Sequence, residues 1–487
     1  KNNRLVTYDG RETAPLGVSE NLFLRDDGQT MDFLEAALGG RSVGTPGLPK
    51  LLHRLHKLYG VADWETLFDP AMELSADGFV ITPRLAKLIR RHADKLKAND
   101  NSQRYFFNPD GTPKKQGEFL KNPAYRQTLE LFRQQGEMAF YTGALAHDIV
   151  AAVRRAPESS GMLSLKDLKS YDVIQRGNLC APYRDYRICS MGEPSSGGLT
   201  ILQILAMLED YDLGKQPNAR AIHLIVEASR LAFADRNFYM ADPAFEETPG
   251  ALLLNPEYTQ KRQGKIKVSQ RLTDNQVQPG LPAGFLPQKL SPDDTIKPPG
   301  TTHLSIADLD GNIVSMTSTI EQAFGSHVMT GGFLLNNQLT DFSFRPEING
   351  WQVANRVAGG KRPRSSMAPT LVFDKHGNPV LAIGSAGGSR IIGYVLKTLV
   401  HVLDWETSIH EAISAPHFLS RGKGIEMEPG LENFHSDLED LGHKISVGPM
   451  NSGLTAILFH SDGSKTGAAD PRREGQPMSL SETPTPD

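Results

Sequence analysis

The most distinctive chemical feature of this sequence is a threonine pair placed directly after a proline-rich approach. Thr301 and Thr302 follow Gly300, and the 29 residues 272–300 contain six prolines without a clear period. A loop of this length with no structure of its own usually has a function. Cleavage between Gly300 and Thr301 would place a free amine beside the Thr301 hydroxyl, and an α-amine with a pKa of about 7.7–8.0 is a base near neutral pH. This is the chemistry of an N-terminal threonine nucleophile.

A hairpin predicted after Thr301 indicates which residues lie beside it. Asp310-Gly311 is a two-residue turn signal between alternating segments. Folding about this turn gives three predicted pairs: Asp308 with Ile313, Ser305 with Met316, and Thr302 with Thr319. We therefore expect Thr319 and Glu321 beside Thr301, within one residue, where they would orient the new amine and bind a substrate ammonium. An ordinary edge strand after a linker is the alternative interpretation of residues 298–305.

A glycine-rich turn lies further along the chain, between a predicted strand and a predicted helix. Strands are predicted at 369–373 and 379–383, and residues 384–390 read Gly-Ser-Ala-Gly-Gly-Ser-Arg before an apolar helical pattern. Backbone N–H groups at such a turn bind anions. The turn lacks the glycine spacing of nucleotide-binding loops. We expect the Gly387 and Gly388 amides to form an oxyanion hole, and a helix cap without a chemical role is the alternative.

Several motifs, each weak alone, occur in a fixed order along nearly the whole chain. They are Asp-Gly-Arg-Glu-Thr-Ala-Pro at 9–15, Pro-Ser-Ser-Gly-Gly at 194–198, Thr-Thr-His through Phe-Gly at 301–325, Lys-Arg-Pro-Arg-Ser-Ser-Met-Ala-Pro at 361–369, and the glycine-rich turn through 392. Smaller matches lie at 232–236, 335–338 and 469–472. Together they resemble the γ-glutamyltransferase (γ-glutamyltranspeptidase) family of N-terminal-nucleophile hydrolases. The resemblance implies an α+β fold, a four-layer αββα sandwich.

The resemblance also implies a role for individual residues. Catalytic roles fall on the nucleophile, its hydrogen-bonded threonine and two oxyanion-hole amides: Thr301, Thr319, Gly387 and Gly388. The cleavage site is the Gly300–Thr301 bond. Substrate-binding roles fall on Arg11, Ser365 and Ser366 for the α-carboxylate of a γ-glutamyl group, and on Glu321, Gln338 and Asp341 for its α-amine. The chemistry agrees, because arginine binds a carboxylate through two parallel donors and carboxylates accept from an ammonium.

The same resemblance implies how the chain is divided. Residues 1–300 would be the large-subunit portion, mostly helical with short strands and ending in the linker 272–300. Residues 301–487 would be the small catalytic subunit, and both would form one intertwined domain. The chain opens at Lys1 without a methionine, so we expect the N-terminal portion of the fold to be missing. We expect the segment 345–360 to be a short lid in which Trp351 either covers the substrate or packs as a surface aromatic.

Composition excludes several other classes of protein. A net charge of −4 over 487 residues gives no reason to expect nucleic acid or an anionic membrane as a partner. No apolar run reaches 18 residues, so no membrane span is predicted. His223 and Glu227 lie one turn apart on a helix predicted to start after Asn218, but no third ligand is near, so we expect no metal and no cofactor. A periplasmic or secreted location is implied by the resemblance alone, and no signal peptide is visible in this sequence.

The only two cysteines are predicted to face each other. Residues 178–183 and 186–191 are typical of a hairpin about Arg184-Asp185, which pairs Cys180 with Cys189. Opposed cysteines of this kind either approach disulfide distance or pack as two small thiols.

Three functions remain open. The first is γ-glutamyl transfer from glutathione-like substrates to water, amino acids or peptides. The second is an acylase of the same fold that removes a glutaryl side chain from a β-lactam, and the third is an uncleaved, non-catalytic relative. Glu321 and Asp341 favour the first, because a glutaryl group has no ammonium for them to bind. The presence of Thr301, Thr319 and both glycines argues against the third.

Overall fold

A computed structural model describes residues 4–286, 289–293, 295 and 300–479. The chain divides into two compact units. Unit 1 comprises Lys1–Thr7, Gly177–Ser318 and Arg364–Asp487, and unit 2 comprises Tyr8–Arg176 and Thr319–Pro363. Each unit takes residues from both sides of the Gly300–Thr301 bond, so the units do not coincide with the two predicted pieces.

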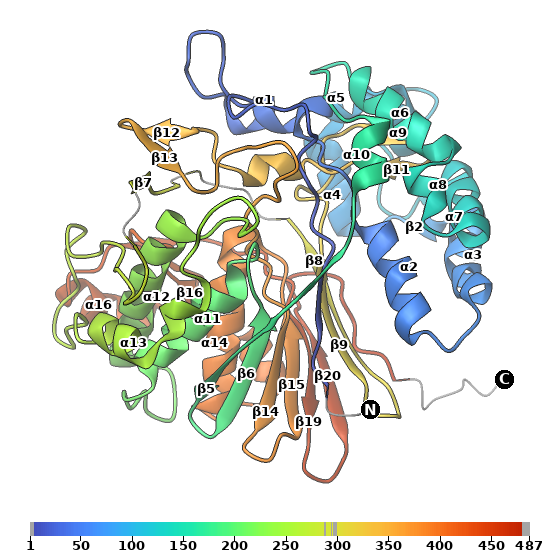
Figure 1. Cartoon of the computed structure of the whole chain (residues 1–487). Coiled ribbons are helices and arrows are strands. Elements are labelled where there is room, and N and C mark those ends of the chain that lie inside the picture. The colour runs from blue at the N-terminus through green and yellow to red at the C-terminus, as the bar shows by residue number, and fades with distance from the viewer. Residues whose placement is uncertain (1–3, 287–288, 294, 296–299, 480–487) are drawn as a thin grey trace. The chain divides into compact units, whose positions relative to one another are not determined.

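Unit 1 contains a six-stranded antiparallel sheet with the order β20-β19-β15-β14-β6-β5. Its strands are β5 (Asn178–Tyr183), β6 (Tyr186–Met191), β14 (Thr370–Asp374), β15 (Pro379–Gly384), β19 (Thr455–Phe459) and β20 (Lys465–Ala469). The helices α11 (Gly197–Leu208), α12 (Ala219–Tyr239) and α14 (Ile391–Leu403) pack on one face of the sheet (Figure 1). Buried side chains such as Ile188, Leu381 and Ile383 form one core with these helices.

A hairpin of β8 (Thr302–Ala307) and β9 (Ile313–Ser318) lies against the other face of this sheet. Successive side chains alternate between the faces of a strand, so Gly384 faces away from Ile383 and the helices. A Cβ at Gly384 would lie 2.3 Å from a ring carbon of His303 on β8. The Ser315 hydroxyl of β9 donates to the Ile383 carbonyl at 3.2 Å. Unit 1 thus holds a helical layer, a sheet and a two-stranded sheet.

The predicted register of the β8–β9 hairpin is wrong by one residue. The observed partners are Ala307 with Ile313, Ser305 with Ser315, and Thr302 with Ser318. The turn explains the shift, because Asp308 N donates to the Asn312 carbonyl at 3.1 Å and closes a three-residue loop. Gly311 takes the left-handed conformation with φ of 81°, as three-residue hairpin loops require. The Asp308 side chain also accepts from the Asn312 N–H at 2.7 Å and stabilises this loop.

Other predictions for unit 1 are confirmed. The hairpin of β5 and β6 has the predicted bounds, and Cys180 pairs with Cys189 in the predicted register. Of the two alternatives for these cysteines, the structure has the disulfide. Asn218 caps α12, since its side chain accepts from the Ala221 N–H at 2.8 Å. The helix after the glycine-rich turn ends at Leu403. The remaining elements of unit 1 are η3 (Gly250–Leu254), α13 (Pro256–Gln263), β7 (Leu290–Ser291), η5 (Gly388–Arg390), α15 (Ile409–Ser414), β16 (Phe418–Leu419), β17 (Ile425–Met427), η6 (Glu432–Phe434), α16 (His435–Asp440) and β18 (Ile445–Val447).

Unit 2 is mostly helical. Its helices are α1 (Phe33–Ala37), η1 (Gly40–Ser42), α2 (Leu48–Tyr59), η2 (Trp64–Phe68), α3 (Asp69–Asp77), α4 (Pro83–Arg91), α5 (Ala93–Lys97), α6 (Asp100–Phe106), α7 (Pro123–Gln135), α8 (Met138–Tyr141), α9 (Ala144–Arg154), α10 (Leu165–Ser170) and η4 (Gln338–Asp341). Its short strands are β2 (Phe79–Val80), β3 (Phe119–Leu120), β4 (Ile174–Arg176), β10 (Met329–Thr330), β11 (Phe333–Leu334), β12 (Glu347–Ile348) and β13 (Trp351–Val353), while β1 (Thr7–Asp9) begins at the unit boundary. Proline in the first turn favours the start of α2, α4 and α7.

The later segment of unit 2 is fixed to the earlier one by a buried amide. The Asn336 side chain accepts from the Gly44 N–H and donates to the Gly44 carbonyl, both at 2.9 Å. Leu339 and Phe342, which frame the end of η4, pack in an apolar cluster with Phe23. These contacts hold η4 against the N-terminal part of unit 2. Across the described part of the whole chain, no helix combines the length and apolar character that a membrane span needs.

Candidate active site

Thr301 lies in unit 1, immediately before β8, in an unusual backbone conformation. Its φ is 90°, which a β-branched residue rarely adopts and which costs about 1–3 kcal/mol where the surroundings enforce it. The Thr301 carbonyl accepts from Nη1 of Arg473 at 2.8 Å. The Gly300 carbonyl accepts from the Gly387 N–H at 2.9 Å. The predicted scissile bond therefore has a hydrogen-bonded carbonyl on each side.

The residue of the glycine-rich turn that donates to the Gly300 carbonyl must be small for a steric reason. Gly387 has φ of 136° and Gly388 has φ of 60°, and both precede α14. A Cβ on Gly387 would lie 2.5 Å from a ring carbon of Tyr394, so no larger residue fits without displacing the ring. The N–H of Gly387 is directed at the carbonyl that self-cleavage would attack. The oxyanion role of Gly387 and Gly388 toward a substrate stays a prediction.

The two adjacent serines of unit 1, Ser365 and Ser366, lie beside an arginine to which the sequence motifs assign no role. Arg236 on α12 donates from Nη2 to the Ser366 hydroxyl at 2.7 Å and from Nε to the Ser196 hydroxyl at 2.9 Å. The Ser365 carbonyl accepts from the Ser196 N–H at 2.9 Å and from its hydroxyl at 2.6 Å. Ser365 and Ser366 therefore have defined positions, and Arg236 adds a positive charge beside them.

In unit 2, three of the predicted binding residues meet in one cluster. Arg11 is buried, and its Nη2 hydrogen-bonds to the Asp341 carboxylate, while its Nε donates to the Pro363 carbonyl at 3.2 Å. Gln338 donates to the same Asp341 oxygen at 2.8 Å. The Asp341 side chain keeps 17% of its surface exposed. The prediction separated Arg11 and Asp341 by role, and they form a salt bridge.

The other two predicted residues of unit 2, Thr319 and Glu321, are linked through the backbone. The Thr319 hydroxyl accepts from the Glu321 N–H at 2.8 Å. Glu321 is buried with φ of 74°, a left-handed conformation that is uncommon outside glycine and asparagine. Asn337 donates from Nδ2 to the Glu321 carboxylate at 2.6 Å. Asn337 thus fixes the carboxylate that we predicted for the substrate amine.

A second acid lies next to Arg11. Glu12 is buried, and burial raises the pKa of its carboxyl from about 4.5 to about 7, with Arg11 opposing the shift. The Glu12 carboxylate lies 3.9 Å from Nη1 of Arg11. Its charge therefore changes near neutral pH, close to a residue that we expect to bind a carboxylate.

The histidine next to the threonine pair is a poor candidate for the catalytic base. Burial lowers the pKa of His303 to about 3, and its Nδ1 lies 2.8 Å from the Thr317 hydroxyl. An imidazole with such a low pKa binds protons weakly near neutral pH. The α-amine of a cleaved Thr301 remains the better candidate.

The predicted helix pair His223 and Glu227 has structural partners. His223 lies 2.7 Å from a ring nitrogen of His443, and Glu227 forms a salt bridge with Arg230 at 2.7 Å. Within the ranges that the structure describes, no group of three potential metal ligands occurs.

Three residues that contact the predicted site were missed by sequence reasoning. Arg236 and Asn337 lie in the smaller matches at 232–236 and 335–338, so a signal was present, but the pattern gave no partner for either side chain. Arg473 directly follows the match at 469–472, and nothing in its neighbours indicates a contact with Thr301.

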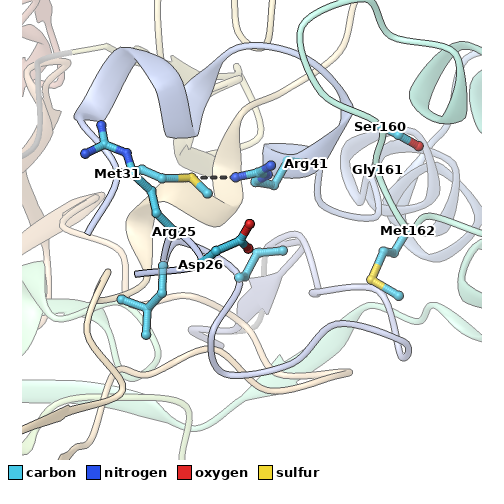
Figure 2. A pocket seen from close by; sticks show the side chains of 9 residues that line it. Arg25, Asp26, Met31, Arg41, Ser160, Gly161 and Met162 are labelled. Atoms are coloured by element: carbon cyan, nitrogen blue, oxygen red, sulfur yellow. Dashed lines mark hydrogen bonds between the residues drawn. The ribbon is translucent and has the colours of Figure 1, made fainter. Parts of the chain in front are cut away.

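A cavity of about 450 Å³ in unit 2 contains none of the predicted residues. Figure 2 shows it between Met31, Met162, Arg25 and Arg41. Its Arg25 is paired with Glu35 at 2.5 Å. The cavity therefore adds nothing to the candidate site.

The sequence is similar to enzymes of one family along almost its entire length. The gamma-glutamyltranspeptidase family model matches residues 1–480. The chain is 33% identical over 485 residues to the glutathione hydrolase proenzyme of Escherichia coli strain K12, covering 97% of this chain and 81% of that protein. It is also 33% identical over 492 residues to the acylase ACY 1 proenzyme of Pseudomonas sp. strain V22, covering 98% and 83%.

The fold is similar to solved structures of an acylase and of a γ-glutamyltranspeptidase. The cephalosporin acylase of Bacillus halodurans matches with a TM-score of 0.84 at 25% identity, over 98% of this chain and 85% of that chain. The γ-glutamyltranspeptidase of Helicobacter pylori matches with a TM-score of 0.55 at 31% identity, over 57% and 80%. The mixed α and β fold agrees with these structures, and the chain belongs to the γ-glutamyltranspeptidase family of N-terminal-nucleophile hydrolases.

Proposed function

We propose that this chain cleaves itself between Gly300 and Thr301 and then acts as a γ-glutamyltransferase and glutathione hydrolase. The substrate would be glutathione or a related γ-glutamyl amide, and the acceptor would be water, an amino acid or a peptide. The observation that carries this proposal is the salt bridge between Arg11 and Asp341, because it places opposite charges side by side.

A γ-glutamyl group carries an ammonium and a carboxylate on the same carbon atom. Adjacent opposite charges on the protein complement such a pair, with Arg11 for the carboxylate and Asp341 for the ammonium. Gln338 supports the assignment, because among the described residues its buried Oε1 atom has no hydrogen-bond partner. A buried acceptor without a donor costs about 1–3 kcal/mol, which a substrate N–H would relieve. Glu321 would supply a further negative charge.

The reaction follows from the groups of a cleaved Thr301. Its hydroxyl attacks the γ-carbonyl carbon, and its α-amine takes the hydroxyl proton. The amide C–N bond breaks, the amine returns the proton to the leaving nitrogen, and a γ-glutamyl ester remains on the threonine. Water or an acceptor amine then attacks the ester by the reverse proton path. Gly387 and Gly388 would stabilise the oxyanion of each tetrahedral intermediate.

The acylase remains the second candidate for a specific reason. A cephalosporin acylase matches this chain over 98% of its length with a TM-score of 0.84, and acylase proenzymes are as similar in sequence as glutathione hydrolase proenzymes. Arg11 would bind a glutaryl carboxylate equally well. Asp341 and Glu321 rank this function second, since a glutaryl group has no ammonium to neutralise two acids.

Turnover of two matched anilides tests the proposal. The purified protein is first examined for a piece that starts at Thr301, and its kcat/KM is then measured for a γ-glutamyl anilide and for the des-amino glutaryl anilide. A clear preference for the γ-glutamyl compound supports the transferase. A preference for glutaryl would establish the acylase, and an uncleaved chain that turns over neither compound would establish a non-catalytic relative.

Further parts of the proposal follow from the family. The mature enzyme would consist of residues 1–300 and 301–487, intertwined in a four-layer αββα sandwich, and Trp351 would either cover the substrate or pack as a surface aromatic. The relatives are named proenzymes, which supports cleavage. The Cys180–Cys189 disulfide supports a periplasmic or secreted location, because disulfides persist in oxidising compartments.

A further inference from the structure

A network of hydrogen bonds surrounds the Gly300–Thr301 bond in unit 1. On one side, the Gly300 carbonyl accepts from the Gly387 N–H. The neighbouring Ala386 N–H donates to the Gly453 carbonyl at 3.4 Å, and the Gly453 N–H donates to the Ser385 hydroxyl at 3.2 Å. The glycine-rich turn is therefore tied to the segment that contains Gly453.

Arg473 completes this network on the other side of the bond, where it contacts Thr301 and the segment that precedes Gly453. Its Nε and Nη2 donate to the Asn451 carbonyl at 3.1 and 3.0 Å, and its Nη1 donates to the Thr301 carbonyl at 2.8 Å. One planar guanidinium thus joins two backbone oxygens that lie far apart in sequence. A lysine, which carries a single ammonium on a flexible stem, cannot reproduce that fork.

Gly453 provides the space in which this side chain lies. A Cβ on Gly453 would be 2.7 Å from Cδ and 2.9 Å from Nε of Arg473. The same Cβ would be 3.1 Å from the Ala386 side chain. The arginine and the turn that carries Gly387 therefore pack against one glycine, so a displacement of either is transmitted to the other.

The geometry points to Arg473 as a positioning residue for self-cleavage, an inference that rests on the proposed function. By fixing the Thr301 carbonyl to the Asn451 segment, Arg473 holds Thr301 at its positive φ and keeps the Gly300 carbonyl on the Gly387 N–H. Loss of Arg473 would let Thr301 relax toward the extended backbone that a β-branched side chain prefers. That relaxation would turn the scissile carbonyl away from its donor.

The step that Arg473 would accelerate is an intramolecular acyl shift. The Thr301 hydroxyl oxygen bonds to the Gly300 carbonyl carbon while the peptide C–N bond breaks, and the hydroxyl proton ends on the released amine. Water then hydrolyses the resulting ester, giving a carboxylate at Gly300 and restoring the Thr301 hydroxyl. The Gly387 N–H would stabilise the oxyanion that forms on Gly300, and misplacing it by a small distance is enough to slow such a step strongly.

The test measures the rate of self-cleavage in the full chain. Wild type, Arg473→Lys and Arg473→Ala are synthesised in a cell-free reaction, and the piece beginning at Thr301 is followed over time. We expect Arg473→Lys to cleave roughly tenfold or more slowly, on the scale of one lost charge-assisted hydrogen bond. Arg473→Ala should be slower still, and guanidinium ion at a sub-denaturing concentration should restore part of its rate, whereas methylammonium should not.

A matched control separates positioning from general stability. Arg184 is also a partly buried arginine of unit 1, and it binds the Tyr211 carbonyl at 2.7 Å and Asp404 at 3.0 Å. Arg184→Lys should cleave at the wild-type rate. Wild-type cleavage in Arg473→Lys, or slow cleavage without guanidinium rescue in a folded Arg473→Ala, overturns the inference. Failure of the wild type itself to cleave at Thr301 overturns the proposed function instead, so the two failures are distinguishable.

Discussion

The predicted functional residues of the two units differ in the groups that they present, which are backbone groups in unit 1 and charged side chains in unit 2. In unit 1, Thr301 and Gly387 are held mainly through backbone groups: a carbonyl on each side of the scissile bond and an amide at a glycine-rich turn. In unit 2, the predicted binding residues Arg11, Asp341 and Glu321 carry charged side chains, and those side chains are held by one another and by Asn337. The first set suits the reacting carbonyl, and the second suits the choice of substrate.

This difference separates substitutions that should affect every substrate from substitutions that should change substrate preference. Backbone donors at a nucleophile serve any acyl group, since the oxyanion that they stabilise is common to all amide substrates. Side-chain charges distinguish a γ-glutamyl group from a glutaryl group, because only the former has an ammonium. Substitutions in unit 1 should therefore affect every substrate, whereas substitutions in unit 2 should change the ratio between substrates.

The largest effect is expected where the chemistry of unit 1 is removed entirely. Thr301→Ala deletes the nucleophile, so the chain should stay in one piece and show no turnover of any anilide. Denaturing gels and mass spectrometry of the purified protein measure this. Thr302→Ala is the matched control, because Thr302 is exposed in β8 and should not be needed for cleavage. Two bands from Thr301→Ala with the same small piece would refute self-cleavage.

A smaller but selective effect is expected at Asp341. Asp341→Asn keeps the shape of the side chain and removes the charge that would neutralise the substrate ammonium. Loss of a counter-ion for a buried charge costs about 3–5 kcal/mol, so kcat/KM for the γ-glutamyl anilide should fall by about 100-fold or more. The glutaryl anilide should be affected little or should improve, since its carboxylate would no longer approach Asp341. The ratio of the two kcat/KM values is the quantity to measure.

Asp9 supplies the control for this ratio. It is a buried carboxylate of unit 2 that pairs with Arg176 at 2.7 Å and has no predicted substrate role. Asp9→Asn should lower kcat/KM for both anilides by the same factor. If Asp341→Asn also lowers kcat/KM for both anilides equally, the role of Asp341 is to stabilise the fold through its salt bridge with Arg11. The γ-glutamyl assignment then loses its main support.

A moderate effect without selectivity is expected at Arg11. Arg11→Lys keeps the charge but loses the planar fork, so the KM of both anilides should rise by roughly tenfold or more, because a charge-assisted hydrogen bond contributes about 1.5–3 kcal/mol. Self-cleavage should be intact. Arg176→Lys changes an arginine that pairs with Asp9 and has no predicted substrate role, so it tests whether the effect is specific to Arg11. An unchanged KM in Arg11→Lys would remove Arg11 from the site.

The sequence allowed more to be predicted in unit 1 than in unit 2, for a physical reason. Glycine-rich turns, hairpins and helix caps are local, so the β5–β6 register, the cap at Asn218 and the end of α14 were predictable. The β8–β9 register was wrong because Asp308 and Asn312 select a three-residue loop over the two-residue one.

Contacts between distant segments were not predictable from the sequence. The salt bridge between Arg11 and Asp341 spans 330 positions, and the contact of Arg473 with Thr301 spans 172. Neither has a periodic pattern that could reveal it. Family resemblance gave Arg11 and Asp341 separate roles, but only the packing of η4 against the N-terminal segment pairs them.

The smallest effect on turnover is expected from two buried groups that give the units opposite responses to pH. Burial raises the pKa of Glu12 in unit 2 from about 4.5 to about 7, and lowers that of Lys397 in unit 1 from about 10.5 to about 7. The folded state thus holds an extra proton on Glu12 between about pH 4.5 and 7, so the free energy of unfolding falls as pH rises through that window. On Lys397 it holds fewer protons between about pH 7 and 10.5, so that free energy rises there.

Two variants separate these contributions. Glu12→Gln should remove the fall in the free energy of unfolding as pH rises from about 4.5 to 7. Lys397→Met should remove the rise in that free energy between about pH 7 and 10.5. A change of about 1 kcal/mol corresponds to a few degrees in Tm. Thermal unfolding at closely spaced pH values measures both, and the shape of each profile matters rather than its height, because Lys397→Met also deprives the Ala412 carbonyl of its donor. The substrate ratio should be unchanged in Lys397→Met. A Glu12→Gln profile parallel to wild type between pH 4.5 and 7 would mean that Glu12 is already ionised beside Arg11, so that unit 2 presents one more fixed charge to a substrate than we infer.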